Sequence, residues 1–547
     1  MKRRARLALL LLVPLGFSYA LHAQVTSSRL LRAAEEPQNW LTYSGTYFSQ
    51  RHSPLKQIDP ANVKNLEMKW VFQAQSLNSF SATPLVVDGV MYLTQAPNDV
   101  VALDAKTGRT FWIYRYTPSP GRLCCRGLVN RGVAILGDTL FLATLDAHVL
   151  ALDAKNGRPL WKTKVALAAD AYGMTLAPLV VKDNVVVGVS GGEYGIRGLI
   201  AAYNAHTGKE AWRFYTIPAP GEPGNETWGN NSWEHGGAPA WLTGSYDPDL
   251  NLIYWGTGNP GPDFNAKQRP GDNLYSDSVV ALDADTGKLK WHFQFTPNDP
   301  YDYDSTQIPV LVDREWSGSQ RKLMLWANRN GFFYVLDRTN GKFLRGRPFT
   351  PVNWASALDE AGRPIRTPQP PDKATYPGAL GSTNWYSPSY SPRTGLFYVS
   401  AWENYAGAFG EGDPVAFVPG QNFTGGGLPP PPGTVAMPGM QRGPINTWNE
   451  GNAHGLVIAI DPQTVDRKWT FTMHDVNTSG ILTTASDLLF VGGREGYFHA
   501  LDARTGALLW KATVGGETAA APMTYQVDGK QYIAIAAGHS LFTFGLR

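Results

Sequence analysis

The sequence predicts an all-β protein, an eight-bladed β-propeller with tryptophan-docking repeats. Two observations support this fold class: a short unit recurs along the chain, and the composition includes 57 Gly, 40 Pro and 18 Trp in 547 residues. Gly-rich turns between aromatic strands are typical of all-β architectures. Length alone would suggest several domains, but the recurrence favours one large body.

The recurring unit is an apolar strand that ends in a tight turn and returns with a tryptophan. Its first copy is ALDAKTG at residues 102–108, followed by Trp112. Further copies lie at 151–161, 202–212, 281–291 and 500–510, with weaker ones at 335–344 and 459–469. The copy at 459–469 lacks the turn glycine.

Each part of the unit has a physical reason. The aspartate that ends the strand, such as Asp104, can bond nearby backbone amides in a turn. The glycine that follows, such as Gly108, readily takes a positive φ. The tryptophan at a fixed offset is suited to packing between neighbouring sheets.

Apolar β runs precede most copies and complete a four-stranded repeat. Examples are 84–87 with 90–93, 178–181 with 185–187, and 488–491. Four strands in roughly 40–50 residues is the spacing of propeller blades. Turn signals at 246–248 and 391–395 add strands between the widely spaced copies, which gives about eight blades. A β-solenoid or a sandwich array is the alternative.

The stretch 411–444 interrupts this pattern. It is rich in Gly and Pro, with four consecutive prolines from Pro429. Such a composition predicts a long inserted loop rather than a blade. Residues 24–547 are then expected to form a single propeller domain.

Residues 1–23 predict a signal peptide. Four basic residues between positions 2 and 6 precede a short apolar run at 7–16, and cleavage is expected after Ala23 or Ala20. The run is too short to predict a membrane span with confidence, so an uncleaved anchor is the alternative. The expected location of the mature product is the periplasm.

Removing these residues changes the charge balance. They hold four of the 48 Lys and Arg residues and none of the 45 Asp and Glu residues, so the formal net charge falls from +3 to −1. The basic balance of the whole chain therefore gives no case for nucleic-acid binding. No later run is long and apolar enough to predict a transmembrane domain.

Cys124 and Cys125 are the two cysteines of the chain. An even count in an exported protein suggests a disulfide, and here it would join neighbours whose Cα atoms are only about 3.8 Å apart. Such a bridge closes a strained ring that encloses almost no chain. We therefore expect a local structural or chemical role rather than stabilisation of the whole fold.

The repeats and the cysteine pair together resemble the pyrroloquinoline quinone (PQQ) dependent alcohol dehydrogenases, the methanol and ethanol dehydrogenase family. The resemblance covers nearly all of the chain after residue 23. It implies that a disulfide between Cys124 and Cys125 forms a lid over one face of PQQ. Arg131, one residue further from the cysteines than in the family, is implied as a partner of a PQQ carboxylate.

The other face of PQQ belongs in this family to a tryptophan eighteen residues before a metal-binding asparagine. Trp241 and Asn259 stand at this spacing. The resemblance therefore implies that Trp241 covers the cofactor and that Asn259 binds the metal. The alternative for Trp241 is packing between blades.

A further segment of the resemblance runs from 190 to 198. The PQQ contacts that it implies are Ser190, Gly191 and Gly192. Glu193 is implied as a metal ligand, and Thr175, eighteen residues earlier, matches a PQQ-binding threonine. Glu193 and Asn259 offer the oxygen donors that a hard cation requires. The alternative for Glu193 taken alone is a solvated loop acid.

The acidic segment 299–304 holds the catalytic group in this resemblance. Asp302 matches the catalytic aspartate, and Asp304 matches a metal-binding aspartate of the rare-earth-dependent members. On a strand-like backbone residues two apart point the same way, so both can face one ion. With Glu193 they make three carboxylates, which favour a lanthanide over calcium. Arg329 matches an arginine near the quinone oxygens; the alternative for Asp304 is a surface acid.

Three positions depart from the family. Ser81 stands where the methanol enzymes have a PQQ-binding glutamate, and Pro239 stands where they have a threonine. Trp402 aligns loosely with an asparagine near the quinone ring. These departures weaken the expectation that methanol itself is the substrate, and they leave the partners of the PQQ carboxylates partly unassigned.

The implied function is oxidation of an alcohol to an aldehyde by hydride transfer to metal-bound PQQ, with Asp302 as the base. The expected cofactors are PQQ and one metal ion, without haem, because the sequence has no Cys-x-x-Cys-His motif. The expected electron acceptor is a separate protein such as a soluble cytochrome c, and a homodimer is an open alternative.

Two other functions stay open. A non-catalytic propeller scaffold of the outer-membrane assembly type would need none of the site residues. A PQQ-dependent enzyme acting on sugars or polyols would use the same cofactor. The sequence does not size the substrate pocket, so it does not separate alcohols from larger polyols.

Overall fold

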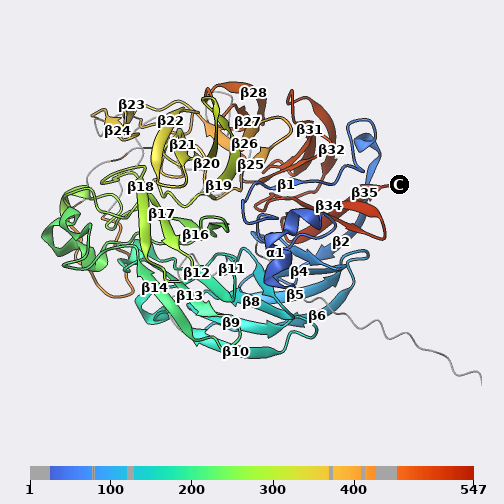
Figure 1. Ribbon diagram of the computed structural model, residues 1–547, viewed down its shortest axis with the longest axis horizontal. Helices are drawn as coiled ribbons and strands as arrows, with labels where there is room; N and C mark the ends of the chain where they lie inside the picture. The colour runs from blue at the N-terminus through green and yellow to red at the C-terminus, as the bar shows by residue number, and fades with distance from the viewer. Residues whose placement is uncertain are drawn as a thin grey trace, which may run out of the picture.

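The computed structural model describes residues 25–76, 78, 80–119, 129–368, 374–407, 409, 413–425 and 453–547. Its strands form eight sheets of four or five strands, arranged as blades in a ring (Figure 1). The prediction of an eight-bladed all-β propeller is confirmed. Within these described ranges, no helix is long and apolar enough to cross a membrane.

Four blades follow one another in the first part of the chain, each an antiparallel sheet. The first has β3 (Leu85–Val87), β4 (Val90–Gln95), β5 (Asp99–Asp104) and β6 (Thr110–Tyr114). The second has β7 (Val133–Leu136), β8 (Thr139–Ala143), β9 (His148–Asp153) and β10 (Pro159–Lys164). The third has β11 (Leu179–Val181), β12 (Asn184–Gly188), β13 (Leu199–Asn204) and β14 (Glu210–Tyr215). The fourth has β15 (Ser245–Asp247), β16 (Leu252–Gly256), β17 (Ser278–Asp283) and β18 (Leu289–Gln294).

The remaining blades complete the ring. The fifth has β19 (Val310–Trp316), β20 (Ser319–Ala327), β21 (Phe332–Asp337) and β22 (Lys342–Pro348), and a hairpin of β23 (Ala355–Leu358) and β24 (Pro364–Arg366) follows. The sixth has β25 (Ser389–Ser391), β26 (Leu396–Glu403), β27 (His454–Ile460) and β28 (Arg467–Thr472). The seventh has β29 (Ile481–Thr484), β30 (Leu488–Gly492), β31 (Tyr497–Asp502) and β32 (Leu508–Thr513). The eighth has β33 (Met523–Val527), β34 (Lys530–Ala537) and β35 (Ser540–Leu546).

The two ends of the chain close the ring. β2 (Leu66–Gln73) pairs antiparallel with β35 and becomes the outer strand of the eighth blade. Figure 1 shows the blue β2 beside the red β35. β1 (His52–Ser53) adds a parallel fifth strand to the seventh blade through β29. Closure pairs strands from opposite ends of the chain, so the ring is held by main-chain hydrogen bonds as well as by packing.

Helical structure is confined to short segments. α1 (Ser27–Leu31) is the one α-helix within the described ranges, and Thr26 caps it by accepting a hydrogen bond from the Arg29 backbone N–H. The 3₁₀ helices are η1 (Ala33–Glu35), η2 (Val63–Asn65), η4 (Ala168–Asp170), η5 (Gly192–Tyr194), η6 (Asn225–Thr227), η7 (Gly229–His235) and η8 (Ala266–Gln268).

The tryptophans of the repeats pack between neighbouring blades, as the repeat predicts. Trp112 donates from Nε1 to the carbonyl oxygen of Ala154 in the next blade, at 3.2 Å. Its ring lies against Gly157, where a Cβ atom would come within 2.6 Å of the indole. Equivalent hydrogen bonds join Trp161 to Ala205, Trp212 to Ala284 and Trp469 to Ala503. The turn glycine therefore supplies both a positive φ and the space for the neighbour's indole.

The copy that lacks the glycine still forms the same turn. Val465 occupies the position with φ 63°, and its N–H donates to the Asp461 carbonyl at 2.7 Å. A branched side chain is strained in this region. The pairing of β27 with β28 and the burial of Val465 in the apolar core hold it there.

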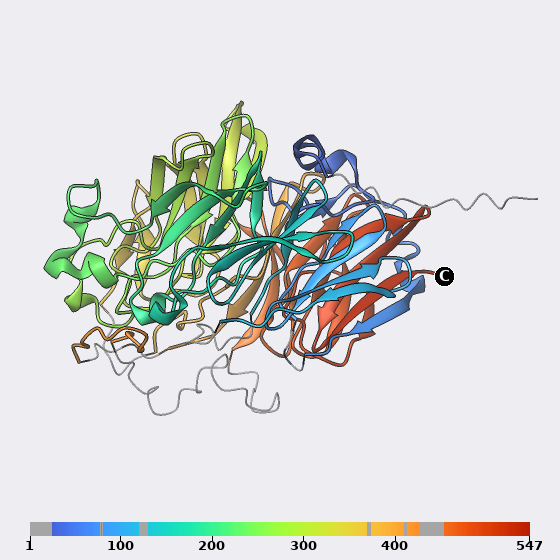
Figure 2. The same ribbon diagram turned by 90° about the horizontal axis from the view of Figure 1, so that it is seen from below.

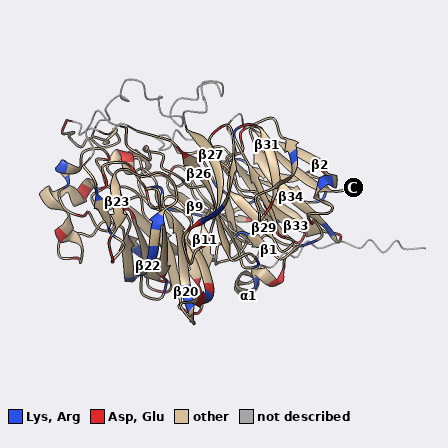
Figure 3. Ribbon diagram, turned by 90° about the horizontal axis from the view of Figure 1, so that it is seen from above, with Lys and Arg blue, Asp and Glu red and all other residues tan. Residues whose placement is uncertain are grey.

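Burial follows the position of each strand in its blade. Every residue of β4 is buried, whereas the outer strand β6 is exposed or only partly buried throughout. Figure 3 shows acidic and basic residues interspersed along the blades. The predicted signal peptide and residues 411, 412 and 426–444 of the predicted loop lie outside the described residues. Residues 413–425 of that loop contain no strand and lie along one side of the ring (Figure 2).

Candidate active site

The candidate site is built from loops of several blades. Arg131 precedes β7, Thr175 precedes β11, and the segment 190–193 follows β12. Trp241, Asn259, Asp302, Asp304 and Arg329 come from the loops before β15, after β16, before β19 and after β20. Cys124 and Cys125 lie outside the described residues.

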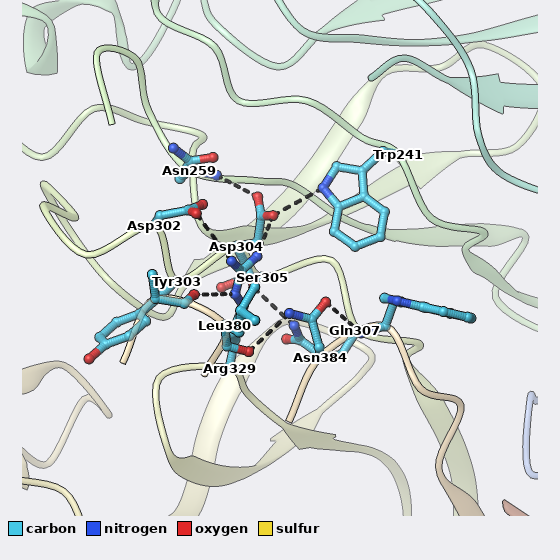
Figure 4. A network of polar contacts seen from close by, with 12 residues as sticks. Trp241, Asn259, Asp302, Tyr303, Asp304, Ser305, Gln307, Arg329, Leu380 and Asn384 are labelled. Carbon is cyan, nitrogen blue, oxygen red and sulfur yellow. Dashed lines mark hydrogen bonds and ion pairs between the residues drawn. The ribbon is translucent and has the colours of Figure 1, made fainter. Parts of the chain in front are cut away.

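Two carboxylates share one guanidinium at the centre of the site (Figure 4). Arg329 donates from Nη1 to Asp304 Oδ2 at 2.6 Å and from Nη2 to Asp302 Oδ2 at 3.2 Å. Asp304 also accepts from Trp241 Nε1 at 3.1 Å and from the Asn259 backbone N–H at 2.9 Å. Asp304 is therefore fixed by three donors from three loops, and it is not a surface acid.

The backbone that carries these carboxylates is a turn. Asp302 has φ 61°, and the Asp299 carboxylate accepts hydrogen bonds from the backbone N–H groups of Tyr301 and Tyr303 at 2.8 and 2.6 Å. The expectation of a strand-like backbone is therefore wrong, because Asp299 folds the segment. Asp302 and Asp304 nevertheless face the same guanidinium.

Burial and neighbouring charges shift the pKa values of the groups at the site. Burial raises the pKa of Asp302 well above its usual range, and the nearby Asp304 adds to the rise, while Arg329 opposes it. Burial also raises the pKa of Glu193. Burial lowers the pKa of Arg329, but the two aspartates outweigh it and leave the pKa raised. Asp302 is thus a stronger base than a free carboxylate, next to a permanent cation.

Glu193 lies in η5, and the two residues before it are glycines at positions where a side chain would have no room. A Cβ atom on Gly191, whose φ is 117°, would lie 2.4 Å from the Ala171 carbonyl oxygen. A Cβ atom on Gly192 would lie 2.9 Å from the ring of Pro239. The side chain of Glu193 is exposed to solvent, although many protein atoms lie around it.

A second network joins the residues that the resemblance assigns to PQQ. The Arg131 guanidinium lies 4.9 Å from the ring of Trp241 and 4.5 Å from the ring of Trp385. Arg131 Nη1 donates to the Thr175 carbonyl at 3.1 Å, and Thr175 Oγ1 lies 3.0 Å from Ser190 Oγ. Trp241 therefore links this network to Asp304, a different role from that of the tryptophans that pack between blades.

The donor chemistry fits a hard cation. Glu193, Asp302 and Asp304 supply carboxylates, and Asn259 supplies an amide. Across the residues that the structure describes, no three His, Cys, Asp or Glu side chains converge closely enough to enclose an ion as they stand. Arg329 instead binds Asp302 and Asp304.

Several residues at the site gave no usable sequence signal. Asn384 lies beside Arg329, and its Nδ2 donates to the Leu380 carbonyl at 2.9 Å (Figure 4). It precedes Trp385, which contacts Arg131, in an irregular loop without a repeat pattern.

Trp402, which aligns loosely with a family asparagine, lies in β26 and donates to the Asn477 carbonyl at 2.7 Å.

Pro239 takes a structural part in the site. Its carbonyl accepts a hydrogen bond from the Gly258 backbone N–H at 2.6 Å. Its ring also limits the space beside Gly192 and Gly258. Ser81 is partly buried.

Comparison with known families gives a match over most of the chain. Residues 40–364 and 429–533 match the PQQ family model described as the glucose/ethanol/alcohol dehydrogenase β-propeller domain. The matched residues include Trp241, Asn259, Asp302 and Asp304. The family is one of oxidoreductases, so the non-catalytic scaffold is not supported.

Three curated relatives show similar identity. The quinoprotein alcohol dehydrogenase PedH of Pseudomonas putida is 38% identical over 95% of this chain and 89% of its own. The quinohemoprotein alcohol dehydrogenase ADH IIB of Pseudomonas putida is 38% identical over 98% of this chain and 79% of its own. The 1-butanol dehydrogenase (cytochrome c) of Thauera butanivorans is 37% identical over 91% of this chain and 74% of its own.

Solved structures share the fold. The quinohemoprotein alcohol dehydrogenase ADHIIG of Pseudomonas putida superposes with a TM-score of 0.87 at 34% identity, over 96% of this chain and 82% of that chain. A europium-containing methanol dehydrogenase superposes with a TM-score of 0.83 at 31% identity, over 95% of this chain and 100% of that one.

These relatives correct the expected cofactor set of PQQ and one metal ion, lanthanide or calcium, without haem. The exclusion of haem is contradicted, because ADH IIB and ADHIIG are quinohemoproteins, whereas PQQ is supported by the family model. The missing Cys-x-x-Cys-His motif tests only covalent haem attachment within residues 1–547. Both relatives extend beyond the part that this chain matches.

The family model and the relatives agree on the cofactor and the class of reaction. The match runs through the loops that hold Trp241, Asp302 and Arg329. The chain therefore belongs to the PQQ-dependent alcohol dehydrogenases.

Proposed function

We propose that the protein is a periplasmic quinoprotein dehydrogenase that oxidises alcohols to aldehydes and passes the electrons to an external acceptor. The observation that carries this proposal is the pairing of Asp302 and Asp304 with Arg329, directly beside the indole of Trp241. This arrangement sets a base, a fixed positive charge and a flat aromatic surface next to one another.

Asp302 is the base in this proposal. Its Oδ2 accepts from Arg329, so Oδ1 is the atom that takes the hydroxyl proton of the alcohol. The raised pKa of Asp302, caused by burial, increases its affinity for that proton. Arg329 opposes that rise in pKa through its positive charge. PQQ, when bound, supplies the acceptor for the two electrons of the alcohol.

Residues from the loops of several blades are proposed to hold PQQ. They are Arg131, Thr175, Ser190, Gly191, Gly192, Trp241 and Arg329, with a disulfide between Cys124 and Cys125 proposed as the lid. The cation–π contacts of Arg131 fix its guanidinium beside the Trp241 ring, which suits a carboxylate partner. The two glycines leave room for the close approach of a planar ligand.

Glu193, Asn259, Asp302 and Asp304 are the proposed ligands of one cation. A cation would offset the crowding of carboxylates that raises the pKa of Glu193 and Asp302 beyond the effect of burial. Its role is to hold the cofactor and to add positive charge where negative charge develops.

The acceptor and the location complete the proposal. The name of the Thauera butanivorans relative states cytochrome c, which supports a cytochrome c as the acceptor here. Residues 1–23 are proposed as the signal peptide and 24–547 as one propeller domain with the inserted loop 411–444. Export would allow the cysteine pair to oxidise.

A dye-linked assay tests this function. The purified full chain is supplied with PQQ and either calcium or lanthanum, and reduction of the dye is followed with primary alcohols and with aldoses. We expect dye reduction that requires PQQ and is faster with alcohols. Turnover of aldoses alone would replace alcohols with sugars as the substrate, and no turnover in any combination would overturn the proposal.

A further inference from the structure

Asp263 is an acidic side chain of the site that the resemblance did not assign. It lies in the loop after β16, four positions beyond Asn259, and is only 2% exposed. Its Oδ1 is buried and has no hydrogen-bond partner. A buried carboxylate oxygen without a partner is costly, and a cation bound to it would remove that cost.

The neighbours of Asp263 are the proposed cation ligands. The Asn259 side chain and Glu193 both lie near the Asp263 carboxylate, and Glu193 is its strongest charged neighbour. The two loops touch, because a Cβ atom on Gly261 would lie 3.6 Å from the Gly192 carbonyl oxygen. Burial and Glu193 together raise the pKa of Asp263 well above its usual range.

The guanidinium groups nearby do not pair with this carboxylate. Arg329 uses both terminal nitrogens on Asp302 and Asp304. Arg269 donates to the backbone carbonyls of Pro262, Asp263 and Asp299 and to the Asn273 side chain, not to the Asp263 carboxylate. Among the described residues, neither Glu193 nor Asp263 therefore has a cationic side chain bonded to its carboxylate.

We propose that Asp263 is a further ligand of the cation, through Oδ1, beside Glu193 and Asn259. This inference rests on the cation site of the proposed function. The Asn259 Nδ2 donates to the Pro260 carbonyl at 3.4 Å. That arrangement leaves the Asn259 Oδ1 and the unpartnered Asp263 Oδ1 for the ion.

Cation binding to the full chain with PQQ tests this inference directly. Calcium chloride and lanthanum chloride are titrated separately by calorimetry into wild type, Asp263→Asn and Glu193→Gln after removal of bound metal with a chelator. We expect Asp263→Asn to weaken binding by about 10-fold or more, because affinity depends on the charge of the ligands. The loss should be larger for the trivalent ion.

Thermal unfolding separates a ligand from a merely structural residue. Without a cation, Asp263→Asn should melt at the same temperature as wild type or higher, because the change removes a buried charge. With a saturating cation, it should gain less in melting temperature than wild type. A structural role alone predicts a lower melting temperature in both conditions.

Asp277 offers a matched control. It is fully buried, both of its carboxylate oxygens lack partners, and its charged neighbours are Asp299, Asp304, Arg269 and Asp302, without Glu193 among them. Asp277→Asn should raise the melting temperature without a cation in the same way. Its cation affinity should stay within about 3-fold of wild type, since it is not a ligand.

Terbium luminescence decides between a direct ligand and a residue that only positions Asn259. Lifetimes in light and heavy water count the water molecules on bound terbium, and Asp263→Ala, which has no side-chain oxygen to bind the ion, should carry one more than wild type. An unchanged water count, or unchanged affinity in Asp263→Asn with weakened binding in Glu193→Gln, would overturn the inference and leave the proposed function intact. Unchanged affinity in both variants would overturn the cation site itself.

Discussion

At the scale of single residues, the site depends on side chains that each contact two neighbouring side chains at once. Arg329 bridges Asp302 and Asp304, and Trp241 contacts Arg131 through its ring and Asp304 through its Nε1. A planar guanidinium and an indole suit such double contacts because their donors are fixed in direction.

Trp241 permits a test of its two contacts. In Trp241→Phe the aromatic face remains but the donor to Asp304 is lost, whereas Trp241→Ala loses both. We expect PQQ binding, measured by calorimetry, to weaken only a few-fold in Trp241→Phe. We expect about 10- to 100-fold weakening in Trp241→Ala, since burying a large apolar side chain contributes roughly 1.5–3 kcal/mol. Wild-type affinity in Trp241→Ala would contradict the proposal that this ring covers the cofactor.

The residues that the sequence predicted are those that sit at fixed spacings in motifs. Trp241 and Asn259 are identifiable by their separation of eighteen positions, and Asp302 by the acidic segment around it. Asp263 and Asn384 lie in irregular loops, where no periodicity connects a position to its neighbours in space. These two residues reach the site because loops of different blades come together there. Such contacts between distant parts of the chain cannot be recognised from a local sequence pattern.

At the scale of elements, the turn between the third and fourth strands of a blade joins that blade to its neighbour. The glycine of this turn lies under the tryptophan of the preceding blade, as Gly157 lies under Trp112. One residue therefore satisfies the turn geometry and the packing between blades. The repeat predicted this because both demands recur at the same offset.

Two glycines of the first blade allow the turn geometry and the packing against a tryptophan to be tested separately. Gly108 has φ 73°, and a Cβ atom there would lie 2.5 Å from the Trp70 ring; Gly89 has φ 85° with open space around it. Gly89→Ala should lower the free energy of unfolding by about 1–2 kcal/mol through backbone strain. Gly108→Ala should cost about 1–3 kcal/mol more, because the methyl group displaces the indole. Equal losses in denaturant unfolding would show that the tryptophan contact contributes nothing.

The irregular elements were less predictable. The turn at 299–304 was expected to resemble a strand, but the Asp299 carboxylate binds the N–H groups of Tyr301 and Tyr303 and bends it. Val465 replaces the expected glycine because core packing outweighs its local strain. In both cases contacts distant from the local motif decide the backbone.

At the scale of the whole molecule, ring closure links the stability of every blade. β2 and β35 bring the two ends of the chain together, and β1 ties the N-terminal segment to the seventh blade. The number of blades was predictable because the repeat is regular. The strand exchange that closes the ring was not, because β2 lies far from β35 in sequence and lacks the repeat.

The closed ring should lose stability in mild acid. His52 of β1 lies 2.9 Å from Thr483 Oγ1, and burial, with a smaller effect of Arg393, lowers its pKa from 6.5 to about 4. The unfolded chain therefore binds this proton more readily than the folded one, so the free energy of unfolding falls as pH drops from 6.5 towards 4. His52→Gln should show a flatter dependence in denaturant unfolding across this range. An unchanged slope would mean that His52 does not contribute.

The central claim is that Asp302 is the base for alcohol oxidation in a PQQ-dependent site. The most direct measurement is the rate of PQQ-dependent dye reduction by a primary alcohol in wild type and Asp302→Asn, with PQQ binding measured on both proteins. The account predicts that Asp302→Asn still binds PQQ but turns over about 10²- to 10⁴-fold more slowly, the usual contribution of a general base. Wild-type turnover in Asp302→Asn with PQQ bound would contradict it.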